Sequence, residues 1–211
     1  MYNFYFVGNN FIEVFMDRKN VATTMILILC TLIFASVGAS FMTYKYEKNK
    51  ILVENPKIFA TNVSVWSKED DTKSQIQELK LSSSSLGLKP VTGKADSDTK
   101  IPSTVTNKNG SEGLYGSFVV TAAAGLTIKV ENIKIESSED AEKIEKQREN
   151  IFVAIMDQTD GAKSLKDDEV ILISEPLAVE EKEYTFLFWL DSKAGEELKG
   201  SKISFDLIFE I

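Results

Sequence analysis

Acids gathered between residues 157 and 169 form the first group whose type and spacing suggest chemistry, because calcium prefers carboxylate oxygens. Counted from Asp157, however, the glycine at Gly161 comes one place earlier than an EF-hand loop requires, and the second ligand carboxylate is missing. We therefore expect a solvated turn here. The alternative is calcium held by Asp167 and Asp168 together with acids from elsewhere in the chain.

Three aromatic residues, Phe59, Trp66 and Trp189, are candidates for a flat platform that binds a sugar ring. For Trp189 we expect packing in the core instead, because it stands in a very apolar run, and the role of Trp66 stays open. A further acidic run at residues 180–183 is interpreted as a charged turn before a strand. None of these patterns specifies a reaction.

Missing residue types exclude much of enzyme chemistry. The chain of 211 residues has no histidine, which removes the commonest general base, and its one cysteine, Cys30, lies in an apolar segment. The net charge of -8 argues against a nucleic acid partner, since phosphate binding requires a concentrated basic face. We expect a protein that is not an enzyme, with no catalytic residue, no metal ligands and no cofactor.

The apolar segment at residues 21–44 contains no charged side chain, and as a helix it would reach about 36 Å, enough to cross a membrane. We interpret it as a retained membrane anchor. The alternatives are a cleaved signal peptide, with small residues for cleavage near Ala39, and a helix of a larger membrane assembly. Residues 1–20 form a short leading segment, in which Met16 is a second candidate for the true start.

From residue 45 the composition changes to that of an exported domain. Residues 45–57 are charged and predict a short stalk, and residues 58–211 hold about seven or eight runs with the alternation of β-strands. Long domains translocate largely regardless of flanking charge, so we place this part outside the membrane. The pattern predicts a mainly β fold, an antiparallel β-sandwich of the jelly-roll or immunoglobulin-like type, preceded by one transmembrane helix.

Turn residues and alternation predict how the strands connect. Residues 58–66 are expected to form one strand. Residues 117–122 and 126–137 are expected to form a hairpin, joined through a short connection in which Gly125 is able to adopt a positive φ.

The apolar residues of the second hairpin strand change face beyond Val130, which requires a bulge or bend near Asn132. A short surface helix follows, with a serine at its amino-terminal cap and Ile144 as its only strongly apolar residue.

Residues 82–113 are rich in Ser, Thr, Lys, Gly and Asp and poor in apolar residues. Such a composition does not offset the entropy of ordering the chain, so we expect a flexible loop, interrupted at most by a short strand around Thr104. Its length marks it as a functional or a solvated insertion.

Three short stretches near the carboxyl terminus carry a resemblance. FWLD at residues 188–191, LKG at 198–200 and ISFDL at 203–207 look like the last strands of small exported β proteins of Gram-positive bacteria, the group that contains camelysin and the TasA biofilm-fibre proteins. Where that group commonly carries Ala-Tyr-Phe after its signal segment, this chain reads SFMTYKY. The resemblance implies a jelly-roll-like sandwich in a bacterial cell-surface or biofilm-matrix protein, and it transfers no catalytic residue.

Together these observations predict a membrane-anchored or secreted surface protein that acts by contact, as a structural, adhesive or self-assembling subunit. Strand edges are expected to make the contact, with a second copy or with a protein or polysaccharide. Two alternatives stand beside this one: a monomeric extracellular binding module for a sugar, a peptide or a metal, and an auxiliary subunit of a membrane or secretion complex. The domain is expected outside the cell membrane, or in the medium if the chain is cleaved near Ala39.

Overall fold

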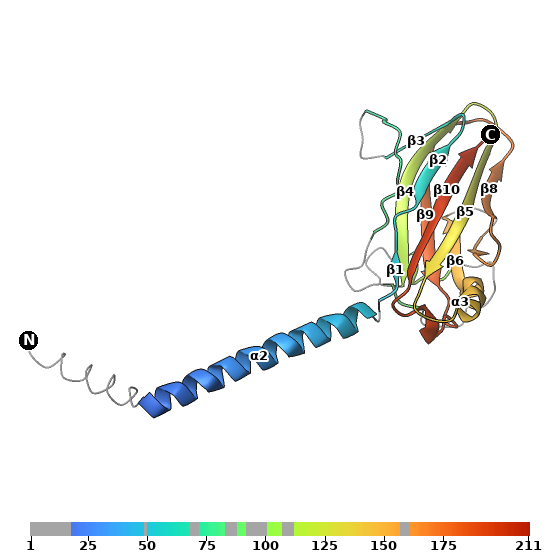
Figure 1. Cartoon of the computed structure of the whole chain (residues 1–211). Helices are drawn as coiled ribbons and strands as arrows, with labels where there is room; N and C mark the ends of the chain where they lie inside the picture. Colours follow the sequence, from blue (N-terminus) through green and yellow to red (C-terminus); the bar gives the residue numbers. More distant parts are fainter. Residues whose placement is uncertain are drawn as a thin grey trace, which may run out of the picture. The chain divides into compact units, whose positions relative to one another are not determined.

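The computed structural model describes residues 18–48, 50–67, 72–82, 88–91, 101–106, 112–156 and 161–211. The chain divides into two compact units, of which the first ends at Lys48 and the second begins at Asn49. The described part of the first unit is a helix, and the second unit is a domain built mainly from β-strands (Figure 1).

The helix of the first unit is α2, Arg18–Lys48. Its stretch Thr23–Ser40 has a mean hydropathy of 2.0, so by length and composition it can span a membrane or act as a signal sequence. The hydroxyls of Thr31 and Ser40 donate to carbonyl oxygens one helical turn earlier, which satisfies these polar groups in apolar surroundings. The predicted apolar helix is confirmed, and it extends beyond residues 21–44 at both ends.

In the part of the chain that the structure describes, ten strands form two five-stranded sheets, and we name each sheet after a central strand. The β10 sheet contains β1 (Leu52–Val53), β2 (Lys57–Ala60), β10 (Lys202–Glu210), β5 (Leu126–Glu136) and β8 (Val170–Glu175). The β9 sheet contains β3 (Val63–Trp66), β4 (Gly113–Ala122), β9 (Val179–Leu190), β6 (Ile151–Ile155) and β7 (Lys163–Ser164). The short helical elements are α3 (Ala141–Gln147), η1 (Arg148–Asn150) and η2 (Glu196–Leu198).

Both sheets contribute side chains to one apolar core. Phe118 of β4 meets Phe209 of β10 edge-on with ring centroids 5.2 Å apart, and Phe188 of β9 stacks on Phe205 of β10 at 5.6 Å. The inward residues of β10 alternate with half-buried ones along the strand: Ile203, Phe205, Leu207 and Phe209. The prediction of a mainly β domain is therefore confirmed, and its two sheets share this core.

The β10 sheet is mixed, so the prediction of a purely antiparallel sandwich is wrong. β1 and β2 both lie parallel to β10, with Leu52 beside Lys202 and Ile58 beside Leu207, while β5 runs antiparallel on the other side. Sequence alternation shows that a segment is a strand, but it carries no information about the direction of a distant partner.

The stalk predicted at residues 45–57 is also not a separate segment. Helix α2 continues to Lys48, and Ile51 is already buried in the domain at 5 % exposure. Ile51 is part of the core and Val53 packs partly against it, and their burial outweighs the polar composition of the surrounding sequence.

Residues 117–122 and 126–137 do not form the predicted hairpin. β4 pairs with β3 and β9, whereas β5 pairs with β10 and β8, so the chain crosses from one sheet to the other between them. Gly125 does not take a positive φ. A glycine fits there because a Cβ would lie 2.9 Å from the carbonyl oxygen of Glu175.

Residues 58–66 likewise change sheet, and the prediction of a single strand is wrong. β2 and β3 are separated by a break at Asn62, which has a φ of 60°. The break resets the alternation, because in β2 Ile58 is buried and Phe59 is 50 % exposed, whereas in β3 Val63 and Val65 are buried.

The bulge predicted near Asn132 is confirmed. The pairing of β5 with β10 shifts register there, with Asn132 and Ile133 opposite the single residue Phe205. Asn132 has a φ of 54°, a left-handed conformation that asparagine tolerates better than most residues. The extra residue lets Ile133 and Ile135 pack against the core after the change of phase.

Two polar segments differ from their predictions in detail. The predicted surface helix is α3, with Ile144 buried, but Asp140 caps it instead of a serine, because its carboxylate accepts hydrogen bonds from the N–H groups of Glu142 and Lys143. The acidic run at residues 180–183 is not a turn but part of β9, where these four residues are exposed to solvent.

The described residues of the predicted flexible loop, 82–113, pack against the domain. Val91 and Val105 are buried, and the N–H of Val91 donates to the carbonyl oxygen of Leu190. A turn, not a strand, surrounds Thr104. Together with the outer face of the β9 sheet, these residues make a second apolar cluster: Val91, Val105, Phe152, Ala154, Ala162, Leu187 and Trp189. The prediction of a solvated excursion is wrong for them, because a few apolar residues suffice to fix a polar segment.

Candidate functional site

One lateral side of the domain is closed by the chain's own backbone. Residues 72–82 lie beside β2 and β3 and hydrogen bond to both strands. The N–H of Ile58 donates to the carbonyl oxygen of Gln77 at 2.9 Å, and the N–H of Ile76 donates to that of Val65 at 3.0 Å. This cover restricts strand addition at β2 and β3, since the edge groups already have partners.

The opposite side ends in β8, the edge strand of the β10 sheet. β8 pairs with β5 on one side, and no described strand pairs with it on the other. Ile171 within β8 is 46 % exposed, and Leu177 just after the strand is 78 % exposed. An uncovered edge presents backbone N–H and C=O groups to a further strand. We call Val170–Glu175 the open edge.

A bulge limits how far the open edge can be extended. The pairing of β5 with β8 shifts between Ile128 and Lys129, because β8 has one extra residue, Leu172. Leu172 and its neighbour Ile173 are both buried. Bulges at sheet edges increase the twist and discourage extended pairing, so the open edge suits a short strand pair.

A groove with a volume of about 700 Å³ lies beside the open edge. Its walls include Val170 and Ile171 of β8, Lys163 of β7 and Phe152 of β6, so residues of both sheets line it. Its charged lining residues have both signs: Glu149, Lys163, Lys166, Asp167, Glu169, Asp191 and Lys193. Such a lining suits an extended polypeptide with apolar and charged side chains more than a polymer of one charge.

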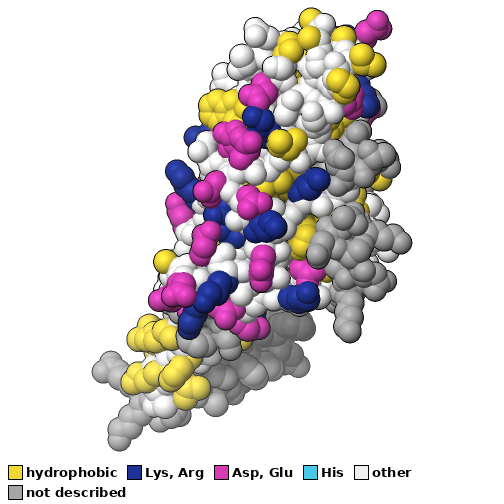
Figure 2. Space-filling model, turned by 90° about the vertical axis from the view of Figure 1, so that its right-hand side faces the viewer, with side chains coloured by type: hydrophobic (Ala, Val, Ile, Leu, Met, Phe, Trp, Pro, Cys, Tyr) yellow, Lys and Arg dark blue, Asp and Glu magenta, His cyan; other side chains and the backbone are white. Residues whose placement is uncertain are grey.

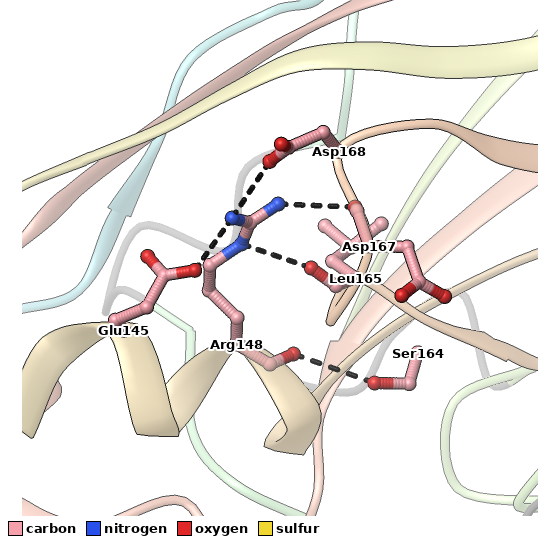
Figure 3. A network of polar contacts seen from close by, with 6 residues as sticks. All are labelled: Glu145, Arg148, Ser164, Leu165, Asp167 and Asp168. Carbon is pink, nitrogen blue, oxygen red and sulfur yellow. Dashed lines mark hydrogen bonds and ion pairs between the residues drawn. The ribbon is translucent and has the colours of Figure 1, made fainter.

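Arg148 fixes the turn that leads into the open edge, and it is only 7 % exposed. Its Nε donates to the carbonyl oxygen of Leu165 at 3.0 Å, and one Nη donates to that of Asp167, also at 3.0 Å. The other Nη donates to the carboxylates of Glu145 at 2.7 Å and Asp168 at 3.0 Å (Figure 3). We call these five residues the Arg148 clasp. It ties α3 to the turn before β8.

Arg148 keeps its positive charge throughout the physiological pH range. Burial lowers the pKa of Arg148, but the hydrogen bonds to Glu145 and Asp168 and the charges of these carboxylates outweigh it, so the pKa lies above its ordinary value. An arginine with a raised pKa stays protonated. The clasp is therefore a fixed brace for the open edge.

Charged side chains of both signs contact one another on the outer face of the β10 sheet. Lys129 hydrogen bonds to Glu210 and lies 3.7 Å from Glu169, and Lys202 contacts Glu54 at 2.7 Å. The hydrogen bond to Glu210 raises the pKa of Lys129, and the one to Glu54 raises the pKa of Lys202. Figure 2 shows cationic and anionic side chains interspersed over the visible surface. A surface mixed in this way has no concentrated field of one sign.

The described calcium candidates, Asp167 and Asp168, are not part of a cluster of acids that could form a metal site. Asp157 lies outside the described residues. Asp168 binds Arg148 through its carboxylate, and Asp167 binds Arg148 through its carbonyl oxygen. Within the described residues there is no group of three or more His, Cys, Asp or Glu side chains that could hold a metal ion.

The three candidate platform residues are not brought together on the surface. Trp189 is 2 % exposed and stacks on Phe152, and Trp66 is 6 % exposed. Phe59 is exposed but belongs to β2 in the other sheet. The expectation of core packing for Trp189 is confirmed, and a platform made of all three residues is wrong.

Arg148 and Ile171 were not singled out from the sequence. The sequence does contain a signal for Arg148. It is an arginine at the end of a short polar helix, followed later in the chain by an acidic pair, Asp167 and Asp168, to which no partner was assigned. A signal for Ile171 is the four-residue apolar run from Val170 to Ile173, which is too continuous for a strand with one buried face.

Comparisons with protein-family models and with curated proteins find no match for this chain.

Proposed function

We propose that this chain is a membrane-tethered surface protein whose β domain lies outside the cell and acts by contact, without catalysis. In this proposal the domain is a jelly-roll-like sandwich and serves as a structural, adhesive or self-assembling subunit. One observation carries the proposal: the domain covers its strand edges on one side with its own backbone, whereas on the other side no strand among the described residues pairs with the outer edge of β8.

The helix supports a tether that is retained. α2 has 31 residues, which corresponds to a length of about 46 Å and exceeds the hydrocarbon core of about 30 Å. It continues beyond Ala39, the candidate cleavage position, to Lys48 without a break. A single apolar helix before a β domain is the usual arrangement of an exported and anchored domain.

The rigid mounting of the open edge supports a role in contact. Its amino-terminal side is braced by the Arg148 clasp, and its inward residues Val170, Leu172 and Ile173 are buried in the core. An edge strand fixed in this way is preorganised, so a pairing strand does not have to order it. Backbone hydrogen bonds then supply affinity, and the groove beside the strand supplies selectivity.

A monomeric binding module for a sugar is the second candidate, because of a different groove. This groove has a volume of about 600 Å³. Its lining includes the hydroxyl groups of Ser82, Tyr115 and Ser117 and the carboxylates of Glu78 and Glu183. Hydroxyl and carboxylate groups beside an aromatic ring suit a polyhydroxylated ligand. Saturable oligosaccharide binding by a monomer would favour this function.

The proposed function is tested by sedimentation of the full chain in detergent micelles over a range of concentrations. The wild type is expected to associate. The variant I171E/S174E is expected to remain monomeric, because like charges that face each other across paired strands are destabilising. Phe59→Glu is the control for an added acidic side chain, since it places one carboxylate at the opposite edge of the same sheet, and it should associate like the wild type. A wild type that stays monomeric at every concentration contradicts the proposal.

A further inference from the structure

We infer that the partner of the open edge is the same strand of a second copy, paired antiparallel, and that the two copies belong to facing membranes. The inference rests on the proposed function and deepens it by naming the partner of that edge. The protein is then an adhesion contact between two surfaces and not a subunit of an endless fibre.

The choice of a second copy follows from the edges that each copy offers. Among the described strands, β2 and β3 are contacted by residues 72–82, and β7 has only two residues. β1 also has two residues, and Ile51 beside it bridges to Leu88. β8, with six residues, is the longest edge without such a cover. Two copies that join through this one strand make a closed twofold contact, whereas a fibre needs a second open edge on each copy.

Charge decides the direction of the pairing. The open edge is preceded by three acids at residues 167–169 and followed by three uncharged residues at 176–178. Parallel pairing in register would place the acids of the two copies about 4.8 Å apart, which is unfavourable. Antiparallel pairing places them instead beside the partner's residues 176–178, which include the exposed Leu177. The direction is therefore antiparallel.

One register centres the contact on the strand. With Leu172 opposite the partner's Ile173, Ile171 lies opposite the partner's Ser174. Ile171 pairs with Lys129 of β5, and Ser174 pairs with Thr127, so both side chains lie on the outer face of the sheet. Substitutions at these two exposed positions change the contact between copies without entering the core.

Antiparallel pairing separates the two points at which the domains join their helices. The open edge lies beside residues 126–130 of β5, whereas Lys50 lies at the other end of the sheet, where its carbonyl oxygen accepts a hydrogen bond from the N–H of Gly200. The stretch of β5 from Ile128 to Glu136 spans about 26 Å at about 3.3 Å per residue. A twofold axis through the open edge thus puts the two copies of Lys50 roughly 50 Å apart, at opposite ends of the joined sheet.

Joining points at opposite ends suit tethers in two facing membranes, because tethers in one membrane need both points on the same side. A contact of one short strand per copy is weak for a single pair. Many copies on two apposed surfaces raise the effective concentration of each partner, so that weak contacts add up. The bulge at Leu172 confines each contact to the strand itself.

The test uses the full chain in lipid vesicles with the domain on the outside, in two vesicle populations that carry different dyes. The wild type is expected to cluster the two populations. The variant I171E/S174E puts like charges opposite each other and is expected to lose clustering. The variant I171E/S174K puts opposite charges across from each other in the antiparallel register, and it is expected to restore clustering. Circular dichroism of each variant checks that the domain is folded.

Each contrary outcome has a distinct meaning. Restoration fails if the pairing is parallel, because each position then faces its own like charge in the partner. Clustering that survives in I171E/S174E overturns the role of the open edge. Wild-type chains that associate in micelles and leave vesicles unclustered overturn the facing-membrane arrangement and leave the proposed function standing. A wild type that does not associate even in micelles is the failure of the proposed function itself.

Discussion

The side-chain amide of Asn132 donates a hydrogen bond to Oδ2 of Asp206 at 2.8 Å, at the point where β5 and β10 lose register. The same asparagine holds the left-handed backbone conformation of the bulge. One residue therefore supplies both the conformation and the cross-strand bond that let β5 keep apolar residues in the core on both sides of the bulge.

Asn132→Ala is expected to lower the free energy of unfolding by about 2 kcal/mol, because alanine is strained at positive φ and the hydrogen bond to Asp206 is lost. Asn132→Gly loses only the hydrogen bond, since glycine adopts positive φ freely, and should cost about 1 kcal/mol. Urea unfolding of the full chain in detergent measures both. Equal costs for the two variants would show that the backbone conformation at the bulge is not strained.

Arg148→Met is expected to destabilise the domain by about 1 to 3 kcal/mol, because it leaves the carbonyl oxygens of Leu165 and Asp167 without their donor, whereas the exposed carboxylates of Glu145 and Asp168 are hydrated. Lys146→Met on the neighbouring helix turn is the matched control, and its side chain is 71 % exposed. It should change the stability by about 0.5 kcal/mol or less. Urea unfolding midpoints compare the two variants, and equal effects would contradict a structural role for the clasp.

Val105→Ala tests whether the described residues of the 82–113 segment pack on the β9 sheet. Val105 is 2 % exposed, and the loss of two buried methyl groups should cost about 2 kcal/mol. Thr104→Ala beside it removes an exposed side chain and should have an effect within about 0.5 kcal/mol. If both variants unfold like the wild type in urea, this segment does not pack on the β9 sheet.

The raised pKa of Tyr184 predicts how the free energy of unfolding changes in alkaline solution. Burial, the charge of Glu175 and the hydrogen bond that the phenol donates to it at 3.2 Å raise the pKa of Tyr184 above its ordinary value of 10.0. The folded chain thus holds the phenol proton more tightly than the unfolded chain. This contribution to stability is complete below about pH 10 and is lost as the pH rises through the folded-state pKa.

Tyr184→Phe should therefore flatten the alkaline decline of stability, although it lowers stability by about 1 kcal/mol at neutral pH through the lost hydrogen bond. Thermal unfolding of both proteins at intervals from about pH 8 to about pH 11 measures the difference. An alkaline decline that is equally steep in the variant would show that other groups cause it.

Local patterns explain why the strands and the bulge could be predicted from the sequence. The alternation in β10 and the change of phase beyond Val130 are visible within a few residues, because each side chain of a strand points to the face opposite its neighbour. The apolar helix was predictable for the same reason, since its signal is contained in a single uninterrupted run.

Pairing between distant residues explains what could not be predicted. A hairpin and a crossing between sheets have the same local sequence, so residues 123–125 gave no sign that β4 and β5 belong to different sheets. The parallel pairing of Leu52 with Lys202 brings together residues that are far apart in the sequence of the domain. The Arg148 clasp depends on Asp168, a residue twenty positions away that lay in a run interpreted as a solvated turn.

The central claim is that an uncut helix holds the β domain at the outer surface of a cell. Protease treatment of intact cells tests this claim most directly. The full chain with a carboxyl-terminal tag is expressed, intact cells are exposed to a protease that cannot enter them, and the membrane fraction is analysed by mass. We predict a full-length chain in the membrane fraction of untreated cells and loss of the tag from whole cells that were exposed to the protease. A tag that survives until the cells are opened, or a chain that begins near Ser40 in the medium, would contradict the claim.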